Sequence, residues 1–162
     1  MPKRSGGGYN NRMRLKSVFS LFILSIMFFS ATKAFADSTS GYAWSENTGW
    51  IDFSQVTVSS SVLSGYAYSP NIGWLSLNCD NTSSCGTTDY KVSNSSGTLS
   101  GYAWSENTGY VDFSQATINT STGIFSGYAY IPNIGWLSFH CANTSSYGTV
   151  EYKVTTAWRP PV

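Results

Sequence analysis

The residues best suited to chemistry in this chain are carboxylates that recur in pairs. Glu46 and Asp52 lie in one short motif, and Glu106 and Asp112 occupy the same positions in a second copy. Two carboxylates facing each other across a sugar would suit a glycosidase, and with the asparagine that follows each glutamate they could bind calcium. Acids at two equivalent places are, however, more typical of duplicated surface features than of one active site. The sequence also has no serine-nucleophile motif, phosphate loop or metal-ligand cluster. We therefore predict a protein that is not an enzyme and has no cofactor and no metal.

The three cysteines are the other reactive side chains. Cys79 and Cys85 flank the loop DNTSS, whereas the equivalent later loop reads CANTSSY, so that Cys141 matches Cys79 and Tyr147 matches Cys85. In an oxidising compartment this spacing favours a Cys79–Cys85 disulfide, which would contribute about 2 kcal/mol because the closed loop is short. Cys141 is then either a buried thiol or half of an intermolecular disulfide that makes a homo-oligomer. His140 replaces an asparagine of the earlier loop, so we interpret it as a surface substitution rather than a base.

Aromatic side chains recur in the same motifs and suggest binding rather than catalysis. Their flat faces can stack on the apolar faces of sugar rings while neighbouring Asn, Ser and Asp bond the hydroxyl groups, but they can equally pack as core. We expect most of them to be core, with some at the rim left to bind, and Trp44 and Trp50 to be the most exposed. The candidate binding residues are Tyr42, Trp44, Trp50, Tyr68, Trp74, Trp104, Tyr110, Tyr130 and Trp136.

The elements that position these residues are repeats. One motif occurs four times, as GYAWSENTGWIDF at 41, GYAYSPNIGWLSL at 65, GYAWSENTGYVDF at 101 and GYAYIPNIGWLSF at 127. The first and third copies match best, as do the second and fourth, so a larger unit of about 60 residues is present twice.

Each copy predicts a β-hairpin. Leu63, Gly65 and Ala67 alternate with Ser64, Tyr66 and Tyr68, so one face of the strand is small and aliphatic and the other is aromatic. The segment between the two strands carries an asparagine able to bond the local backbone and a glycine suited to positive φ, which are the residues of a tight turn.

A third strand precedes three of the hairpins, as VTVS, DYKVS and TINT, but the first copy has no room for one. The chain ends with TVEYKV, residues 149–154, which has no hairpin after it and could supply the missing strand. We therefore predict an all-β, antiparallel fold of four three-stranded units in two duplications, closed by this C-terminal strand. An open β-meander or solenoid, or a sandwich, is the alternative.

The N-terminal segment has the layout of a secretory signal peptide. Basic residues are followed by an apolar run, residues 18–29, and by Ala34-Phe35-Ala36, which predicts cleavage after Ala36. Met13 is a plausible true start, and an uncleaved anchor is the alternative to cleavage. We thus predict a signal peptide at 1–36, a single β-repeat domain at 37–158 and a tail at 159–162, in a secreted or extracytoplasmic protein that meets the membrane only through its signal peptide.

The charge of the exported part limits its partners. Six of the nine basic residues precede the cleavage site, which leaves three basic residues against eight acids, or 3 − 8 = −5. So few cations argue against nucleic acid, whose phosphates are bound by Lys and Arg.

The motifs GYAWSENTGW, GWLSLNCDNTSSCGTTDYKV and SSGTLSGYAW resemble tandem repeats of exported bacterial proteins without an established biochemical role, over residues 38–154. That family's pattern includes the paired loop cysteines, so the resemblance implies that Tyr147 removes the disulfide from the second loop. A weaker likeness is to choline- and glucan-binding hairpin repeats, whose Trp-Tyr-Tyr pattern is missing here. We predict a non-catalytic surface module that recognises glycans or the cell envelope, with a self-associating adhesive protein as the alternative and an exported hydrolase as a distant third.

Overall fold

The computed structural model describes residues 36–145 and 148–161, and almost all of its regular structure is β-strand. The predicted signal peptide falls outside the described residues apart from Ala36. The described part contains no helix with the length and apolarity that a membrane crossing needs. The strands are β1 (Asp37–Ser45), β2 (Gly49–Val58), β3 (Leu63–Ser69), β4 (Gly73–Ser76), β5 (Val92–Ser95), β6 (Thr98–Ser105), β7 (Gly109–Ile118), β8 (Phe125–Ile131), β9 (Gly135–Ser138) and β10 (Val154–Thr156), and two 3-10 helices are η1 (Cys79–Thr82) and η2 (Cys141–Thr144).

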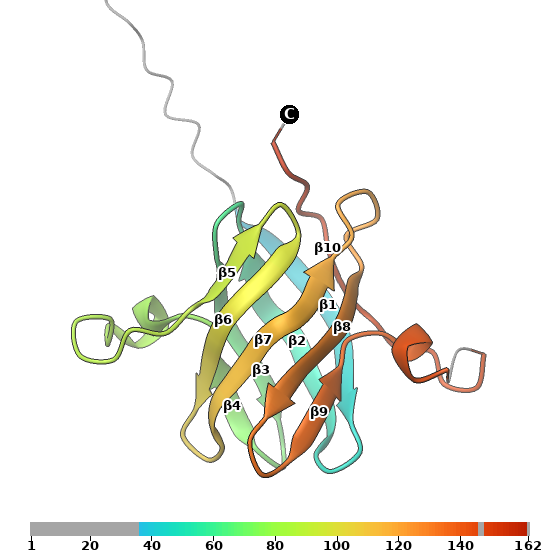
Figure 1. Ribbon diagram of the computed structural model, residues 1–162, viewed down its shortest axis with the longest axis horizontal. Helices are drawn as coiled ribbons and strands as arrows, with labels where there is room; N and C mark the ends of the chain where they lie inside the picture. Colours follow the sequence, from blue (N-terminus) through green and yellow to red (C-terminus); the bar gives the residue numbers. More distant parts are fainter. Residues whose placement is uncertain (1–35, 146–147, 162) are drawn as a thin grey trace, which may run out of the picture. The chain divides into compact units, whose positions relative to one another are not determined.

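The strands form an antiparallel barrel that closes on itself (Figure 1). The sheet runs β10-β1-β2-β3-β4-β6-β7-β8-β9, with β5 beside β6, and β9 also pairs with β1 where Ser138 lies opposite Trp44. The ten strands occupy eight positions around the barrel. β4 and β5 share one position, because both pair with β6, and β9 and β10 share another, because both pair with β1. The prediction of an all-β antiparallel fold is confirmed, and the closed form is adopted rather than the open meander, solenoid or sandwich.

The predicted division into four three-stranded units is wrong. VTV and TI are not separate strands but the ends of β2 and β7, each of which continues unbroken from its hairpin. A bulge in each strand makes this possible: the pairing of β2 with β3 shifts between Asp52 and Gln55. The Asp52 carboxylate accepts a hydrogen bond from the backbone N–H of Ser54 at 2.8 Å, which stabilises the bend. Each duplication therefore supplies four barrel positions.

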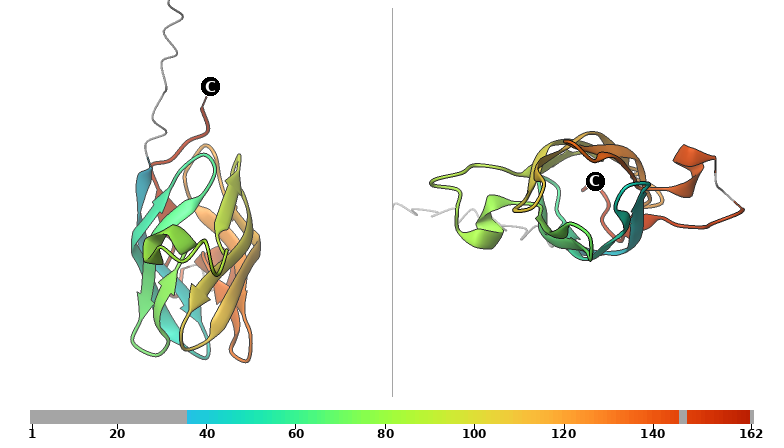
Figure 2. Two further views of the ribbon diagram at one scale, coloured as in Figure 1. Left: turned by 90° about the vertical axis from the view of Figure 1, so that its left-hand side faces the viewer. Right: turned by 90° about the horizontal axis from the view of Figure 1, so that it is seen from below.

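A C-terminal strand does supply the strand that the first copy lacks, but this strand is β10 (Val154–Thr156), which shares only Val154 with the predicted strand at 149–154. β10 pairs with β1, placing Thr156 opposite Thr39 and Val154 opposite Gly41, in the same way that β5 pairs with β6. The chain then crosses the end of the barrel opposite the four tight turns (Figure 2). Trp158 is there only 2% exposed and belongs to the barrel core, so the C-terminal segment closes that end.

The interior of the barrel is filled by the small, aliphatic and phenylalanine side chains of the motifs. Phe139 lies at the centre of a cluster, with ring centroids 5.5 to 5.8 Å from those of Phe53, Phe113 and Phe125. An eight-stranded barrel is just wide enough for such side chains to fill it. Because neighbouring side chains of a strand point to opposite faces, the Tyr and Trp residues of the four motifs are on the outside, whereas Trp158 of the C-terminal segment is in the core. The expectation that most of them are core is therefore wrong.

Glycine at the start of each motif lets neighbouring strands approach closely at the bulge. At Gly65, φ is +85°, and a Cβ atom there would lie 2.1 Å from the carbonyl oxygen of Gln55. A larger residue would be strained by the backbone conformation and would clash with the adjacent strand.

Candidate functional site

Aromatic side chains surround the outer wall of the barrel. Each hairpin places two of them opposite each other on its two strands, with ring centroids 4.6 to 5.0 Å apart. Exposed fractions range from 39% to 50% for eight of the side chains, which are Tyr42, Trp50, Tyr68, Trp74, Tyr102, Tyr110, Tyr130 and Trp136.

Seven of the nine candidate binding residues are among these exposed side chains, whereas Trp44 and Trp104 are half-buried. Trp44 is covered because it lies between two strands, opposite Trp50 of β2 and Ser138 of β9. Trp74 is 50% exposed and Trp50 is 41% exposed. The expectation that Trp44 and Trp50 are the most exposed is therefore wrong.

The chain leaves the barrel wall twice to form side arms. The first arm, residues 78–91, begins and ends at the pair Asn78–Lys91, and the second arm, residues 140–153, at the pair His140–Lys153. The arms project from opposite sides of the barrel (Figures 1 and 2). Each arm lies beside one of the two seams at which the halves of the barrel meet, namely β4 against β6 and β9 against β1.

A groove follows the first seam beside the first arm, and we call it the first groove. Its cavity volume is about 920 Å³, in the usual range for ligand sites. It is lined by Gln55, Tyr66, Gly73, Trp74, Ser76, Thr82, Ser84, Thr88, Tyr90, Trp104, Glu106, Asn107 and Tyr110.

The lining of the first groove combines flat rings with neutral hydrogen-bonding groups. Trp74, Trp104 and Tyr110 supply aromatic surface, while amides and hydroxyls supply donors and acceptors. Glu106 is the one charged residue in this lining, and no Lys or Arg takes part. The groove is therefore suited to an uncharged ligand that has both apolar faces and hydroxyl groups, and it repels anions.

The first arm is fixed to the barrel by a repeated hydrogen-bond pattern. The side-chain amide of Asn81 donates to the carbonyl oxygen of Gly65 at 2.7 Å and accepts from the Gly65 N–H at 3.0 Å. The hydroxyl of Tyr66 donates to the carbonyl oxygen of Asn81, and that of Tyr90 donates to Ser76 Oγ. Asn143 makes the same two bonds to Gly127 from the second arm. The arm wall of the groove is thus held in place before any ligand arrives.

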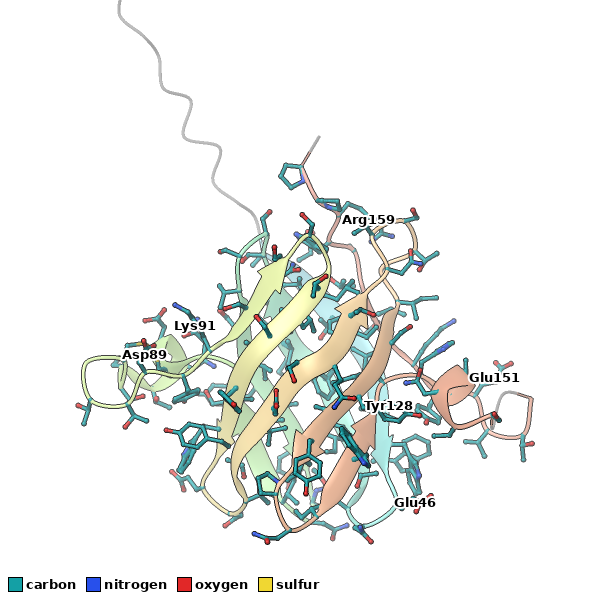
Figure 3. The ribbon with its side chains drawn as sticks, viewed as in Figure 1. Glu46, Asp89, Lys91, Tyr128, Glu151 and Arg159 are labelled. Atoms are coloured by element: carbon teal, nitrogen blue, oxygen red, sulfur yellow. A yellow bond between two sulfur atoms is a disulfide. The ribbon has the colours of Figure 1, made fainter. Side chains whose placement is uncertain are left out.

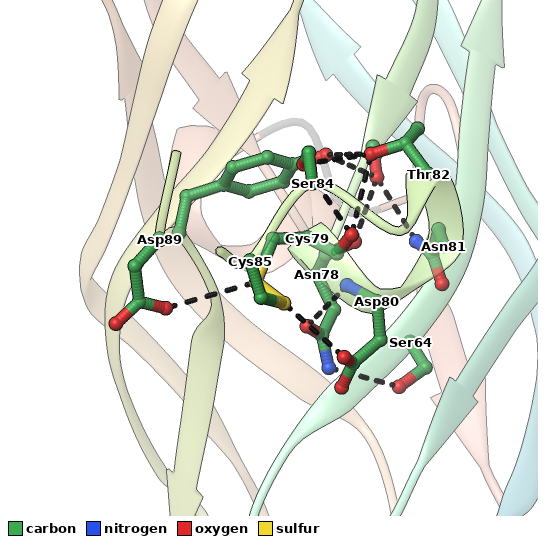
Figure 4. Close-up of a disulfide and its surroundings, with 11 residues drawn as sticks. Ser64, Asn78, Cys79, Asp80, Asn81, Thr82, Ser84, Cys85 and Asp89 are labelled. Atoms are coloured by element: carbon green, nitrogen blue, oxygen red, sulfur yellow. Dashed lines mark hydrogen bonds between the residues drawn. A yellow bond between two sulfur atoms is a disulfide. The ribbon is translucent and has the colours of Figure 1, made fainter. Parts of the chain in front are cut away.

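The predicted disulfide between Cys79 and Cys85 is confirmed, with the two Cα atoms 4.9 Å apart (Figure 4). It closes the loop that contains η1 and links Cys85 back to Cys79 at the base of the first arm. The first turn of η1 is capped by the Asn78 side chain, which accepts from the Asp80 N–H. Cys141, at the start of η2, is 2% exposed. Its thiol is therefore not presented on the surface, and an intermolecular disulfide would require the second arm to move.

The second seam carries two smaller cavities where the first seam carries one. We call the cavity of about 540 Å³ the second groove. It contains Trp44, Glu46, Gln115 and Trp136, which correspond to Trp104, Glu106, Gln55 and Trp74 of the first groove. A neighbouring pocket of about 670 Å³ contains Trp50, Tyr152 and Lys153. Figure 3 shows Glu46 near the tight turns and Glu151 on the second arm, the two acids that line these pockets.

The aromatic wall of the second seam differs from that of the first at one position. Trp50 occupies the position of Tyr110, and its ring lies edge-on to Tyr152 with centroids 5.5 Å apart. In the first groove, Tyr110 and Tyr90 both line one continuous cavity. The larger indole ring thus reaches the second arm, where it lines the pocket of about 670 Å³ but not the second groove.

The paired acids do not form a two-carboxylate centre around a common cavity. Asp52 and Asp112 each accept a bond from the backbone of their own bulge, at 2.8 Å. Glu46 and Glu106 line different seams. Within the described ranges, the one cluster of three His, Cys or acidic residues close enough to hold a metal is Cys79, Asp80 and Cys85, and both cysteines are in the disulfide.

The expectation that the turn asparagines bond their own local backbone is wrong for three of them, because their side chains bond neighbouring hairpins. Asn107 donates to the carbonyl oxygen of Ile72 at 3.1 Å, Asn71 donates to that of Thr48 at 2.9 Å, and Asn47 donates to that of Ile134. In the described part of the chain no corresponding bond from Asn133 is found, and its φ is +63°. The bonds of Asn107 and Asn47 cross the first and second seams, and that of Asn71 joins the first two hairpins, so all three connect adjacent hairpins at the tight-turn end of the barrel.

The sequence analysis missed one exposed aromatic side chain and several residues that line the grooves. Tyr102 is 50% exposed and matches Tyr42, so the repeat alone could have identified it. Gln55 and Gln115 follow the bulges, whose register shift decides the face on which they lie. Thr88 comes from the arm, and nothing in the sequence predicts how the arm folds against the wall.

The chain matches no family model, no curated protein and no solved structure. Its function must therefore be argued from this surface.

Proposed function

We propose that this protein is a non-catalytic recognition module that binds neutral glycans through the aromatic side chains of its outer wall. The observation that carries the proposal is the composition of the first groove: Trp74, Trp104 and Tyr110 beside amides and hydroxyls, with no basic residue in the lining. Pyranose rings with equatorial substituents have flat C–H faces and a rim of hydroxyls, which match such a lining. Polyanionic glycans are disfavoured by Glu106 and by the net charge of −5 after the predicted cleavage site (3 − 8).

We further propose that the protein acts outside the cytoplasm, as an exported bacterial protein. The layout of the N-terminal segment supports export, and the Cys79–Cys85 disulfide is typical of oxidising compartments. A glycan of the cell envelope or its surroundings is the partner that such a location offers.

The test is a binding panel by affinity electrophoresis. Hydroxyethylcellulose and glucomannan are the neutral β-1,4-linked probes, and alginate and polygalacturonate are the anionic comparators. We expect retardation by the neutral polymers, loss of retardation in the double variant Trp74→Ala/Trp136→Ala, and little change in Tyr102→Ala. Tyr102 is as exposed as Trp74, at 50%, but lies outside the lining of either groove. Equal retardation by all four polymers, or by none, would contradict the proposal.

Self-association is a second candidate function, favoured by the same exposed aromatics. A surface with eight aromatic side chains at least 39% exposed is typical of interaction sites. Light scattering coupled to size-exclusion chromatography distinguishes the two functions. A multimer that forms without glycan and is lost in Trp74→Ala/Trp136→Ala favours assembly, whereas a monomer that the neutral polymers retard favours glycan recognition.

A further inference from the structure

The two grooves are built from equivalent residues on opposite sides of one chain. Trp74 and Trp136 follow the glycine of equivalent tight turns, and both strands pair in the same register with their hairpin partners. The seams themselves also correspond, because Ser76 lies opposite Trp104 at the first and Ser138 lies opposite Trp44 at the second. The duplication has thus produced two copies of the proposed glycan site, and not only two copies of a scaffold.

The two copies face different directions. Thr82, Ser84 and Thr88 of the first arm line the first groove, and Thr144 of the second arm lines the second. Since the arms project from opposite sides of the barrel (Figure 2), a short oligosaccharide in one groove does not reach the other. The closed barrel between them, with its filled core, holds the two sites at a fixed separation.

We propose that a single chain is bivalent and links two segments of neutral β-1,4-linked glycan, one in each groove. The inference rests on the proposed function, because it assigns the same kind of ligand to both grooves. Its consequence is mechanical: two weak sites on a rigid body crosslink a polymer that neither site alone would hold firmly. We expect the first groove to bind more tightly, because its larger volume, about 920 Å³ against about 540 Å³, allows more contacts with an oligosaccharide.

Each groove is formed by the barrel wall and one arm of the same chain. All residues of both linings belong to this chain, and their arm walls are fixed by the bonds of Asn81 and Asn143 to the barrel. Bivalency is therefore a property of the monomer, which separates it from crosslinking by a dimer with one site per chain.

The experiment measures stoichiometry and crosslinking with cellohexaose and hydroxyethylcellulose. Calorimetry should give two cellohexaose molecules per wild-type chain and one per chain in Trp74→Ala or in Trp136→Ala. Dynamic light scattering should show hydroxyethylcellulose growing into larger particles with the wild type, and returning to its own size when cellohexaose is in excess. Each single variant should bind the polymer without enlarging the particles, while Tyr102→Ala should behave as the wild type.

The outcomes separate the two proposals. One cellohexaose per wild-type chain without crosslinking would overturn bivalency and leave glycan recognition standing. Crosslinking that persists in both single variants would also overturn it, because self-association would then be the cause; sedimentation velocity of the unliganded chain would show the dimer. Binding of neither probe by the wild type would overturn the glycan proposal and bivalency together. Far-UV circular dichroism and thermal unfolding of each variant confirm that it is folded.

Discussion

The two halves of the barrel, β1–β5 and β6–β10, are alike in the wall and different on its outside. Their strand registers agree pair by pair: Tyr42 lies opposite Asp52 as Tyr102 lies opposite Asp112, and both hairpins bulge at the same place. Outside the wall, only the first arm has a disulfide, and the two seams carry cavities of different shape. Closure of the barrel requires the same inward-facing side chains and the same bulges in both halves. The arms and grooves lie outside the wall, so their sequences can differ without opening the barrel.

The two halves also end differently, and this yields the largest expected effect. β5 leads through a tight turn into β6, whereas β10 leads into the segment that carries Trp158 into the barrel core. Deleting residues 149–162 should abolish cooperative unfolding, because β1 loses its pairing with β10 and the core loses the closing side chain of Trp158. Trp158→Ala alone should lower the free energy of unfolding by about 3–5 kcal/mol. Thermal and denaturant unfolding measure both; deletion of residues 160–162 is the control, and an unchanged transition in the longer deletion would contradict the closure of the barrel by β10.

The sequence predicts this closure because the repeat count is uneven: TVEYKV has no hairpin after it, and the first copy has no strand before it. Alternation likewise predicts the two faces of each hairpin. It does not predict which face is inside, since both are apolar enough to form a core. The barrel's circumference decides that question: Phe53, Phe113, Phe125 and Phe139 fill the interior at the level of the motifs and leave no room there for the Tyr and Trp side chains of the same strands.

The grooves are less predictable from sequence than the barrel, because they form between elements that are distant in the chain. Trp74 and Glu106 line one cavity only because β4 meets β6 at the seam, and Thr88 joins them through the arm. The Cys79–Cys85 disulfide was predictable because its loop is short and local.

The disulfide is the clearest difference between the arms, and removing it should make them more alike. Reduction of the Cys79–Cys85 bond should lower the free energy of unfolding by about 2 kcal/mol, mainly because the unfolded chain without the crosslink has more conformational entropy. Denaturant unfolding with and without a phosphine reductant measures the change. In the variant Cys79→Ser/Cys85→Ser the reductant should have no effect. A wild type that is equally stable in reductant would mean that the hydrogen bonds of Asn81 and Tyr90 alone hold the first arm.

The tight turns offer a smaller test of the same comparison. Asn107 of the third turn donates to Ile72, whereas Asn133 of the fourth has the left-handed φ of +63°. Asn107→Ala should therefore cost about 1 kcal/mol of stability. Asn133→Gly should leave stability unchanged or slightly raised, since glycine adopts this φ without strain. Both values come from denaturant unfolding, and an equal loss in the two variants would show that the turns do not differ in this way.

The smallest expected effect concerns Trp50, the indole ring that contacts Tyr152 of the second arm at the second seam. In the background Trp74→Ala, where the first groove is disabled, only the second groove should bind cellohexaose. Adding Trp50→Tyr removes the ring that lies 5.5 Å from Tyr152, so the pockets of about 540 and 670 Å³ should join. Calorimetry should then show binding about threefold tighter, or ~0.7 kcal/mol.

The reverse exchange is the matched control. In the background Trp136→Ala, Tyr110→Trp should place an indole ring toward Tyr90, divide the first groove and weaken cellohexaose binding by a similar factor. If Trp50→Tyr instead weakens binding, Trp50 is a platform on which the sugar stacks and not a partition. The first groove would then owe its greater strength to Thr88 and the other polar groups of its arm.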